Sequence, residues 1–576
     1  MTVESNAILQ MVYGLQITTT PDEWKRRLPN ALIWFDYMSI PQPGAGSDGK
    51  SSDHRLAEGV ADDVVEQLRD AVDSIPTFVE RCSMMWVLAP PCRHADVEDQ
   101  ICDFSSWRSR GWCRLEYAAA KLSRGDDMQI MVISNIEATP EYFNPCDTMK
   151  LAATRGVFAV DDDRIKVSKT LQTMLDAKVA NYEALDDMTL ARVLRAFAPI
   201  FLPKADSEST AGGGIEHVKT LFHWRDEATE AAWQKHTGWN LLTLACAVDD
   251  ETAVTELLAT DEGRAMISSR GIMEKKKLTP LRIQPFSKLL MDLLTGMTPL
   301  MAAVTFSRPV VISALLDAGA PMPVGVKLFG DNPCQFRGMF AGKIDNLRLL
   351  LSRFPELASK VNQAGASACA FACMLSRDQC QVDILKDLLD HGAASTLGVE
   401  HMAYGTPLMI LSQNLDADPA AVSLLHEAAP NGRELLETKG TLHKAWKAIA
   451  PLMAILRLFG VNAAKGVKRI TTGGPGNIHP NGATAMHIAA QRGHISMVKA
   501  MADLPSADQA ILQARDKYGH TPLERARHTA APTHVEALEP VLEGDATVDT
   551  LSKKAGGKGG SWVSVAPPAQ VLPKEA

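Results

Sequence analysis

The stretch NGATAMHIAAQRGHISMVKAMADL, residues 481–504, decides how the larger part of this chain folds. A first helix opens after Thr484 and carries small alanines, which let a second helix approach closely. Gly493 and His494 separate it from a second helical run, Ile495–Leu504. A single pair of helices cannot bury its apolar side alone, so neighbouring pairs must stack.

Weaker copies of this pattern recur on the N-terminal side of residue 481 and once after it. They read TGMTPLMAA (Thr295–Ala303) followed by VVISALLDAGA, GTPL (Gly405–Leu408), GHTPL (Gly519–Leu523), GWNLLTLA (Gly238–Ala245), LKDLLDHGA (Leu385–Ala393) and NLRLLL (Asn346–Leu351). Proline suits the first helical turn, where its missing N–H has no partner to lose, and glycine at a helix end can adopt the left-handed conformation. The anchoring glycines, at 238, 296, 365, 405, 482 and 519, are unevenly spaced. The spacing predicts five to seven units with insertions.

The glycine, Thr-Pro-Leu-His-like segment and alanine pair resemble the ankyrin repeat, whose period is roughly 33 residues. The resemblance is strongest at Asn481–Leu504 and Thr295–Ala320. It implies an all-α solenoid over residues 216–545 with a protein partner on its concave surface. It also implies that His487 makes a turn-stabilising hydrogen bond, in preference to a catalytic or metal-binding role.

Residues 1–202 have a different pattern, in which short apolar runs alternate with amphipathic helices. Strands are predicted at Ala31–Tyr37, Cys82–Ala89 and Met128–Ser134, and helices at Asp62–Ser74 and Trp112–Ser123. Uninterrupted apolar strands indicate a parallel sheet covered on both faces. The N-terminal part is therefore predicted to be an α/β domain.

The segment from Ser74 to Leu122, with SSWRSRGWCRLEYAAAKL after its central strand, resembles Toll/interleukin-1 receptor domains. LIWFDYMSIPQ, Leu32–Gln42, is similar to the corresponding part of heterokaryon-incompatibility domains. These resemblances imply a flavodoxin-like domain and place Glu116 where NAD-cleaving members have their catalytic glutamate. Toll/interleukin-1 receptor domains open with a strand, for which Ile8–Leu15 is the candidate here, and the domain is expected to be incomplete at its start.

Four residues follow as candidates for a nucleotide site. Trp112 and Glu116 are four apart and lie on one helix face, where an indole and a carboxylate can receive a cationic ring and steady oxocarbenium-like charge. Asp36 ends a predicted strand, the usual position for ligand contacts in open α/β sheets. Arg114, with Arg108 and Arg110, is a candidate for holding phosphates. The alternatives are a glutamate favoured by the helix dipole, a core tryptophan, a turn aspartate and a solvated basic face.

The composition argues against several classes of function and location. The formal net charge is −9, with 59 Lys and Arg against 68 Asp and Glu, which argues against nucleic acid. No apolar run reaches the length of a membrane span, the N-terminus does not read as a secretory signal, and the ten cysteines show no disulfide framework. Cys92, His94 and Cys102 lack paired metal-ligand spacing, so no metal site is predicted. A cytoplasmic location is expected.

Two further segments are predicted to lack a core. PKADSESTAGGG, within 203–215, is expected to be a linker, and residues 546–576, which include KKAGGKGG, a disordered tail. The preferred function is protein interaction and signalling, with the α/β domain as an assembly or effector module that self-associates. The alternative is an NAD-cleaving hydrolase regulated by the repeats, with NAD as its substrate.

Overall fold

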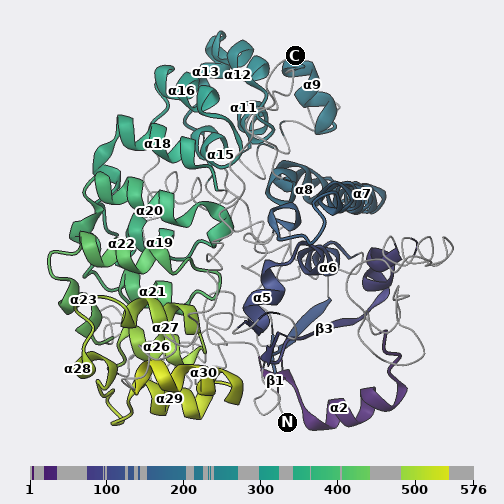
Figure 1. Cartoon of the computed structure of the whole chain (residues 1–576). Coiled ribbons are helices and arrows are strands. Elements are labelled where there is room, and N and C mark those ends of the chain that lie inside the picture. The colour runs from purple at the N-terminus through teal and green to yellow at the C-terminus, as the bar shows by residue number, and fades with distance from the viewer. Residues whose placement is uncertain are drawn as a thin grey trace, which may run out of the picture.

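The computed structural model arranges the chain as an N-terminal α/β part beside a curved array of helix pairs (Figure 1). The structure describes residues 3–4, 18–34, 70, 74–94, 97, 100–123, 128–134, 140–142, 152–202, 213–224, 231, 234, 239–269, 297–322, 342–362, 365–401, 405–441 and 482–543. Within these residues, no helix combines the length and apolar character needed to cross a bilayer.

A small mixed sheet forms the centre of the N-terminal part. Its strands run β3 (Met84–Leu88), β6 (Gln129–Ile133) and β7 (Glu141–Tyr142) in that order; β3 and β6 are parallel, whereas β6 and β7 are antiparallel. Two short antiparallel pairs accompany it, β1 (Val3–Glu4) with β2 (Thr18–Thr19), and β4 (Cys92–Arg93) with β5 (Ile101–Cys102).

Helices surround this sheet and connect it to the array. They are α2 (Pro21–Arg27), η1 (Leu28–Asn30), α5 (Phe104–Ser109), α6 (Gly111–Leu122), η3 (Ala153–Arg155), α7 (Asp163–Ala184), α8 (Met188–Phe201) and α9 (Gly214–Leu221). The first turn of α2 has a capping box, in which Thr20 and Glu23 satisfy each other's backbone N–H groups. The long helices α7 and α8 pack together, and α8 reaches the first helices of the array (Figure 1).

The array stacks antiparallel helix pairs, each with an inner helix followed by an outer one. The inner helices are α11 (Leu241–Ala247), α15 (Pro299–Phe306), α19 (Ala368–Ala372), α21 (Pro407–Gln413), α26 (Ala485–Gln491) and α29 (Pro522–Thr529). The outer helices are α12 (Glu251–Leu258), α16 (Pro309–Asp317), α20 (Gln381–Asp390), α22 (Ala420–Ala428), α27 (Ile495–Ala502) and α30 (Pro532–Leu542), and α18 (Ile344–Arg353) lies between α16 and α20. The remaining short elements are α13 (Asp261–Ala265), η4 (Pro355–Leu357), η5 (Arg377–Gln379), η6 (Ala393–Thr396), α23 (Gly432–Glu437) and α28 (Gln509–Leu512).

Local sequence explains where the inner helices begin. Thr298, Thr406 and Thr521 each precede a proline at the first helical position, and each side-chain hydroxyl accepts a hydrogen bond from a backbone N–H three residues later. The hydroxyl satisfies one donor that the helix leaves unpaired, and the proline has no N–H to satisfy. Gly365, Gly405, Gly482 and Gly519 have positive φ, as do Gly319 and Gly392 at the ends of outer helices. The predicted repeat pattern is therefore confirmed at these turns.

The outcome for the N-terminal predictions is mixed. The strands predicted at Cys82–Ala89 and Met128–Ser134 and the helix predicted at Trp112–Ser123 are confirmed, and the two strands pair in parallel. The strand predicted at Ala31–Tyr37 does not form over residues 31–34, and 35–37 lie outside the described residues. The sheet was predicted to be covered on both faces. This prediction is wrong for β3, because its Trp86 and Leu88 are 40% and 50% exposed.

Other predictions fall where the structure gives no description. These are the candidate strand Ile8–Leu15, most of the helix Asp62–Ser74, residues 203–212 of the predicted linker and the predicted tail from residue 546. A flavodoxin-like topology and the proposed domain boundaries stay predictions.

Candidate functional site

Three of the predicted nucleotide-site residues, Trp112, Arg114 and Glu116, lie on α6, which directly follows α5. The side chain of Asp103 accepts a hydrogen bond from the Ser106 N–H at 3.0 Å and so caps α5. At the junction, the Gly111 N–H donates to the Val157 carbonyl at 2.9 Å, and the Val157 N–H donates to the Ser109 carbonyl at 2.7 Å. The segment before α7 therefore holds the start of α6 in place.

Trp112 and Glu116 lie one turn apart on α6, and both are partly buried. The indole N–H of Trp112 donates to the Asp163 carboxylate at 3.1 Å, at the start of α7. This bond fixes the indole against α7. The structure thus places the two side chains on one helix as predicted, and their role in binding or catalysis stays a prediction.

Arg114 points toward the repeat array. Its Nε donates to the Arg108 carbonyl at 2.7 Å, Nη1 donates to the Ala152 carbonyl at 3.3 Å, and Nη1 and Nη2 lie 2.9 and 3.4 Å from the two carboxylate oxygens of Asp378. Its side chain is 5% exposed. In this arrangement Arg114 binds an aspartate 264 positions later in the sequence, whereas the run of basic residues had suggested a bound phosphate.

The fourth candidate, Asp36, lies outside the described residues. Arg110 is exposed, and Arg108 is buried in an ion pair with Asp416, to which its Nε donates at 2.9 Å. Of the basic residues considered for phosphate binding, Arg108 and Arg114 therefore both contact the repeat array.

A separate cavity of about 540 Å³ lies between residues 76–80 and α7. Its lining includes the lysines Lys166, Lys169 and Lys178, one acid, Glu80, and the apolar residues Leu122 and Met174. Lys178 is buried, donates to the Ser123 carbonyl and lies over the Tyr182 ring. Glu116, Trp112 and Arg114 do not line this cavity.

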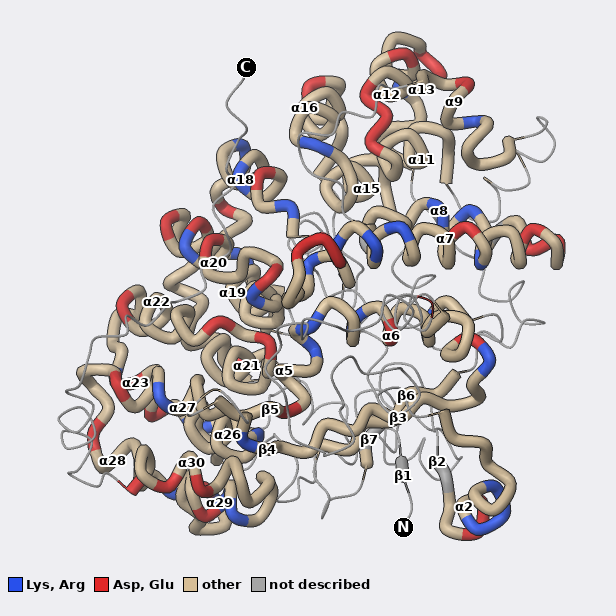
Figure 2. The backbone as a smooth tube through the Cα atoms, turned by 45° about the vertical axis from the view of Figure 1, so that its right-hand side comes forward, with Lys and Arg blue, Asp and Glu red and all other residues tan. Residues whose placement is uncertain are grey.

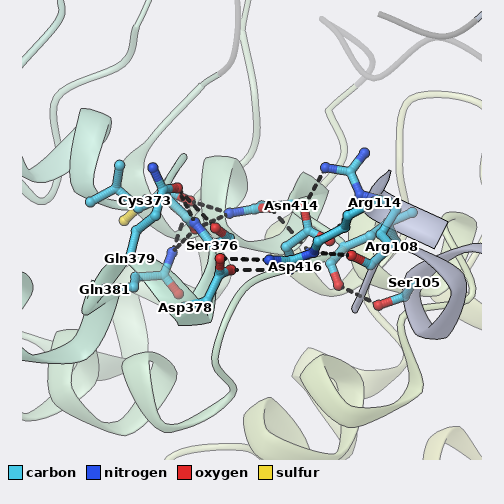
Figure 3. A network of polar contacts seen from close by, with 12 residues as sticks. Ser105, Arg108, Arg114, Cys373, Ser376, Asp378, Gln379, Gln381, Asn414 and Asp416 are labelled. Atoms are coloured by element: carbon cyan, nitrogen blue, oxygen red, sulfur yellow. Dashed lines mark hydrogen bonds and ion pairs between the residues drawn. The ribbon is translucent and has the colours of Figure 1, made fainter. Parts of the chain in front are cut away.

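Three of the polar contacts between the two parts of the chain form what we term the interdomain seam: Arg108–Asp416, Arg114–Asp378 and Asp103–His534. The two aspartates of the array lie in turns that join an inner helix to its outer helix, namely the turns α19–α20 and α21–α22 (Figure 3). In Figure 2, basic segments of the α5 region lie beside an acidic segment next to α21. The seam thus runs along one edge of the array.

Amide side chains build the turns that present these aspartates (Figure 3). Asn414 donates from its side-chain nitrogen to the carbonyls of Cys373 and Leu375, at 3.0 and 2.6 Å. The Gln381 amide donates to the Leu375 carbonyl at 2.7 Å, and its oxygen accepts from the Asp418 N–H at 2.8 Å. Because neighbouring turns are bonded to each other, both aspartates are held in position by contacts within the array itself.

The third seam contact involves His534 at the C-terminal end of the array. His534 Nε2 lies 3.2 Å from the Asp103 carboxylate. Burial alone would raise the pKa of Asp103, but the hydrogen bonds from His534 and from the backbone of Ser106 bring it below its ordinary value. His494 is buried nearby, and this burial lowers its pKa to about 4, although Asp103 and Asp416 act in the opposite direction.

The predicted concave binding surface is covered in this structure over part of the array, whereas Arg527 and His528 of the inner helix α29 are exposed. Every residue of α11, α15 and α26 is buried, so these inner helices expose no side to solvent. The α8 helix contributes to this cover, since Phe197 meets Phe306 of α15 edge-on with ring centroids 5.4 Å apart. The sequence could not show this, because an inner helix that faces a partner and one that faces its own chain are both apolar.

The array has a second edge, formed by the turns that lead from each outer helix to the next inner helix. It lies at the other end of the inner helices from the interdomain seam. In the last such turn Tyr518 is 43% exposed, its ring lies 6.3 Å from that of His520, and Lys517 lies over it at 5.0 Å. We refer to these three residues as the Tyr518 turn.

Comparison with known proteins identifies the C-terminal repeats. The family model described as Ankyrin repeats (3 copies) matches residues 452–550, which include the stretch 481–504. A search of curated proteins finds no match. The ankyrin prediction is confirmed over the matched residues, whereas the resemblance of the N-terminal domain to Toll/interleukin-1 receptor and heterokaryon-incompatibility domains stays a prediction.

Proposed function

We propose, from the ankyrin repeats at residues 452–550, that this protein acts in the cytoplasm as a protein-interaction platform in which the N-terminal α/β domain is an assembly or effector module. Ankyrin arrays generally bind proteins over an extended surface. The interdomain seam supports a single platform, because two arginines with almost no exposure each contact an aspartate of the array. The seam is the observation on which the proposal depends.

The proposal assigns the partner to the Tyr518 turn. The inner helices α11, α15 and α26 are covered, and the opposite edge is occupied by the N-terminal domain. The exposed tyrosine offers an apolar ring with polar groups around it, and tyrosine is enriched at protein interfaces.

The test starts with cross-linking of the tagged full chain in its own cells, followed by identification of the linked protein and titration with the purified partner. Tyr518→Ala should weaken the affinity roughly tenfold, the loss typical of a buried aromatic at an interface. Leu185→Ala, at an exposed position after α7, is the matched control and should leave affinity unchanged. Cross-links confined to residues outside 482–543, or equal affinity of the Tyr518 variant, would refute the assignment.

The alternative function, NAD cleavage, is supported by the position of Glu116 one turn after Trp112 on α6. Purified protein incubated with NAD should then release nicotinamide, and Glu116→Ala should abolish the release. Lys121→Ala, on the same helix, serves as the control. Absence of nicotinamide at high protein concentration would leave the interaction platform as the function of the chain.

Self-association through the N-terminal domain is tested with the same purified protein. Light scattering over a concentration series should show an increase in mass, and Trp86→Ser should remove that increase, because this side chain is 40% exposed on the outer strand β3. Val310→Ser, at a position 43% exposed on the array, is the matched control and should associate like the wild type. A constant monomer mass in the wild type would exclude self-association.

A further inference from the structure

Two free cysteines face each other across the short β4–β5 pair, next to the interdomain seam. Cys92 in β4 is the register partner of Cys102 in β5, and the strands are antiparallel. Directly opposite residues in such a pair have side chains on the same face of the ribbon. The two thiols are therefore neighbours although ten positions separate them in the sequence.

The backbone spacing suits a disulfide. Cys92 and Cys102 are directly opposite each other in the antiparallel register. Directly opposite residues in such a pair have Cα atoms about 4.5 to 5.5 Å apart. Disulfides need Cα separations of roughly 4.4 to 6.8 Å. The strands can thus be bridged without a change of register.

The two thiols differ in exposure. Cys92 is exposed, whereas Cys102 is partly buried, and burial together with the nearby Cys92 and Asp103 raises the pKa of Cys102. An oxidant in solution therefore reaches Cys92 first, and Cys102 is positioned to react second. Buried Cys369 and Cys373 in the array are shielded from the same reagent.

We propose that Cys92 and Cys102 form a reversible disulfide, so that this strand pair is a redox modification site. The oxidant is a low-molecular-mass disulfide such as glutathione disulfide. The Cys92 thiolate attacks it, forms a mixed disulfide and releases one glutathione thiolate; the Cys102 thiolate then attacks the Cys92 sulfur and releases the second. The two cysteine sulfurs lose two electrons, glutathione disulfide gains them, and the two thiol protons leave to solvent and the released thiolates.

Residues next to the two cysteines connect this redox site to the interdomain seam. Pro91 accepts a hydrogen bond from Thr533 at 3.4 Å, Arg93 lies 3.7 Å from Glu536, and Asp103 contacts His534. All three partners belong to α30, and each of the N-terminal residues is adjacent in sequence to one of the two cysteines. A disulfide would join the two strands that carry these contacts and so restrict their separation from α30.

The experiment equilibrates the full-length protein in buffers with graded ratios of reduced to oxidised glutathione, followed by acid quenching and mass measurement. The wild type should lose about 2 Da with no bound glutathione. Digestion with trypsin should link peptide 82–93 to peptide 94–108, and fragmentation of this pair should assign the bond to Cys92 and not to Cys82, which lies in the same peptide. Cys102→Ser should instead retain one glutathione on Cys92.

The matched control is Cys380→Ser, which removes another exposed cysteine. This variant should form the Cys92–Cys102 disulfide at the same glutathione ratio as the wild type. Accumulation of only the glutathione adduct on wild-type Cys92 at every ratio, or linkage of Cys92 to a different cysteine, would overturn the proposal. Circular dichroism of each variant checks that it is folded.

Discussion

His487 connects one ankyrin repeat to the next through Nε2 of a neutral ring, while Nδ1 bonds to the start of its own helix. Its Nδ1 accepts from the Thr484 N–H at 3.3 Å, and its Nε2 lies 3.0 Å from the His520 carbonyl, 33 positions later. A protonated ring could not accept at Nδ1, and burial lowers the pKa of His487 to about 4. The hydrogen bond expected from the ankyrin resemblance is confirmed.

A pH dependence of stability follows from this histidine. The unfolded ring titrates near 6.5 and the folded ring near 4, so the unfolded chain takes up the proton first as the pH falls. The stabilisation is complete above pH 6.5 and is lost progressively toward pH 4, by about 3 kcal/mol in total. Urea unfolding from pH 7.5 to 4.5 should show the decline, and His487→Gln should reduce its slope. His391→Gln, at an exposed position, should not.

Asp516 and Arg525 form an ion pair with side chains 1% and 2% exposed. Asp516→Ala would leave the buried guanidinium without this carboxylate, although its Nε still donates to Gln491, and should lower the free energy of unfolding by about 3 to 5 kcal/mol. Asp516→Ala combined with Arg525→Met should cost less than Asp516→Ala alone, because no charge is then left unpaired. Urea unfolding of both variants measures the difference; equal losses would contradict it.

At the scale of elements, the turn between α26 and α27 sits against the start of α30. Gly493 has φ of 66°, and a Cβ atom there would lie 2.2 Å from Nδ1 of His534. Gly392, after α20, has φ of 92° and open space around the same position. The two glycines therefore share a backbone requirement and differ in what surrounds them.

Replacing each of these two glycines by alanine distinguishes backbone strain from steric crowding by His534. Gly392→Ala should cost about 1 kcal/mol, because alanine disfavours the left-handed backbone. Gly493→Ala should cost roughly 3 kcal/mol, because His534 must also move away from Asp103. Thermal unfolding measures the loss of stability in each variant. Amide hydrogen exchange at residues 101–106 should accelerate only in the Gly493 variant. Equal losses in the free energy of unfolding would show that the His534 side chain moves aside without an energetic cost.

At the scale of the whole molecule, the interdomain seam joins residues that are far apart in the chain. Arg108 and Asp416 are 308 positions apart, and Arg114 and Asp378 are 264 apart. Both arginines are buried, so water cannot replace a missing aspartate. The seam contacts should therefore matter far more than the ion pairs on outer helices.

Asp378→Ala tests this difference. It leaves Arg114 buried without its carboxylate and should cost about 3 kcal/mol, and it should let the N-terminal part unfold at a lower temperature than the array in calorimetry. Asp317→Ala removes a pair of similar length, 3.0 Å to Arg353, whose side chains are 62% and 44% exposed. That loss should stay below about 1 kcal/mol. A single unchanged transition for Asp378→Ala would contradict the proposed coupling.

Sequence alone determined the helix pairs of the array, because capping at Thr298, Thr406 and Thr521 and the left-handed glycines depend on neighbours within a few residues. It also determined the helix that carries Trp112 and Glu116. Only the tertiary structure decided that Arg114 binds Asp378 and that the inner helices α11, α15 and α26 are covered. Ion pairs between distant segments and the partner of an apolar face depend on how the chain folds back on itself, which local sequence does not encode.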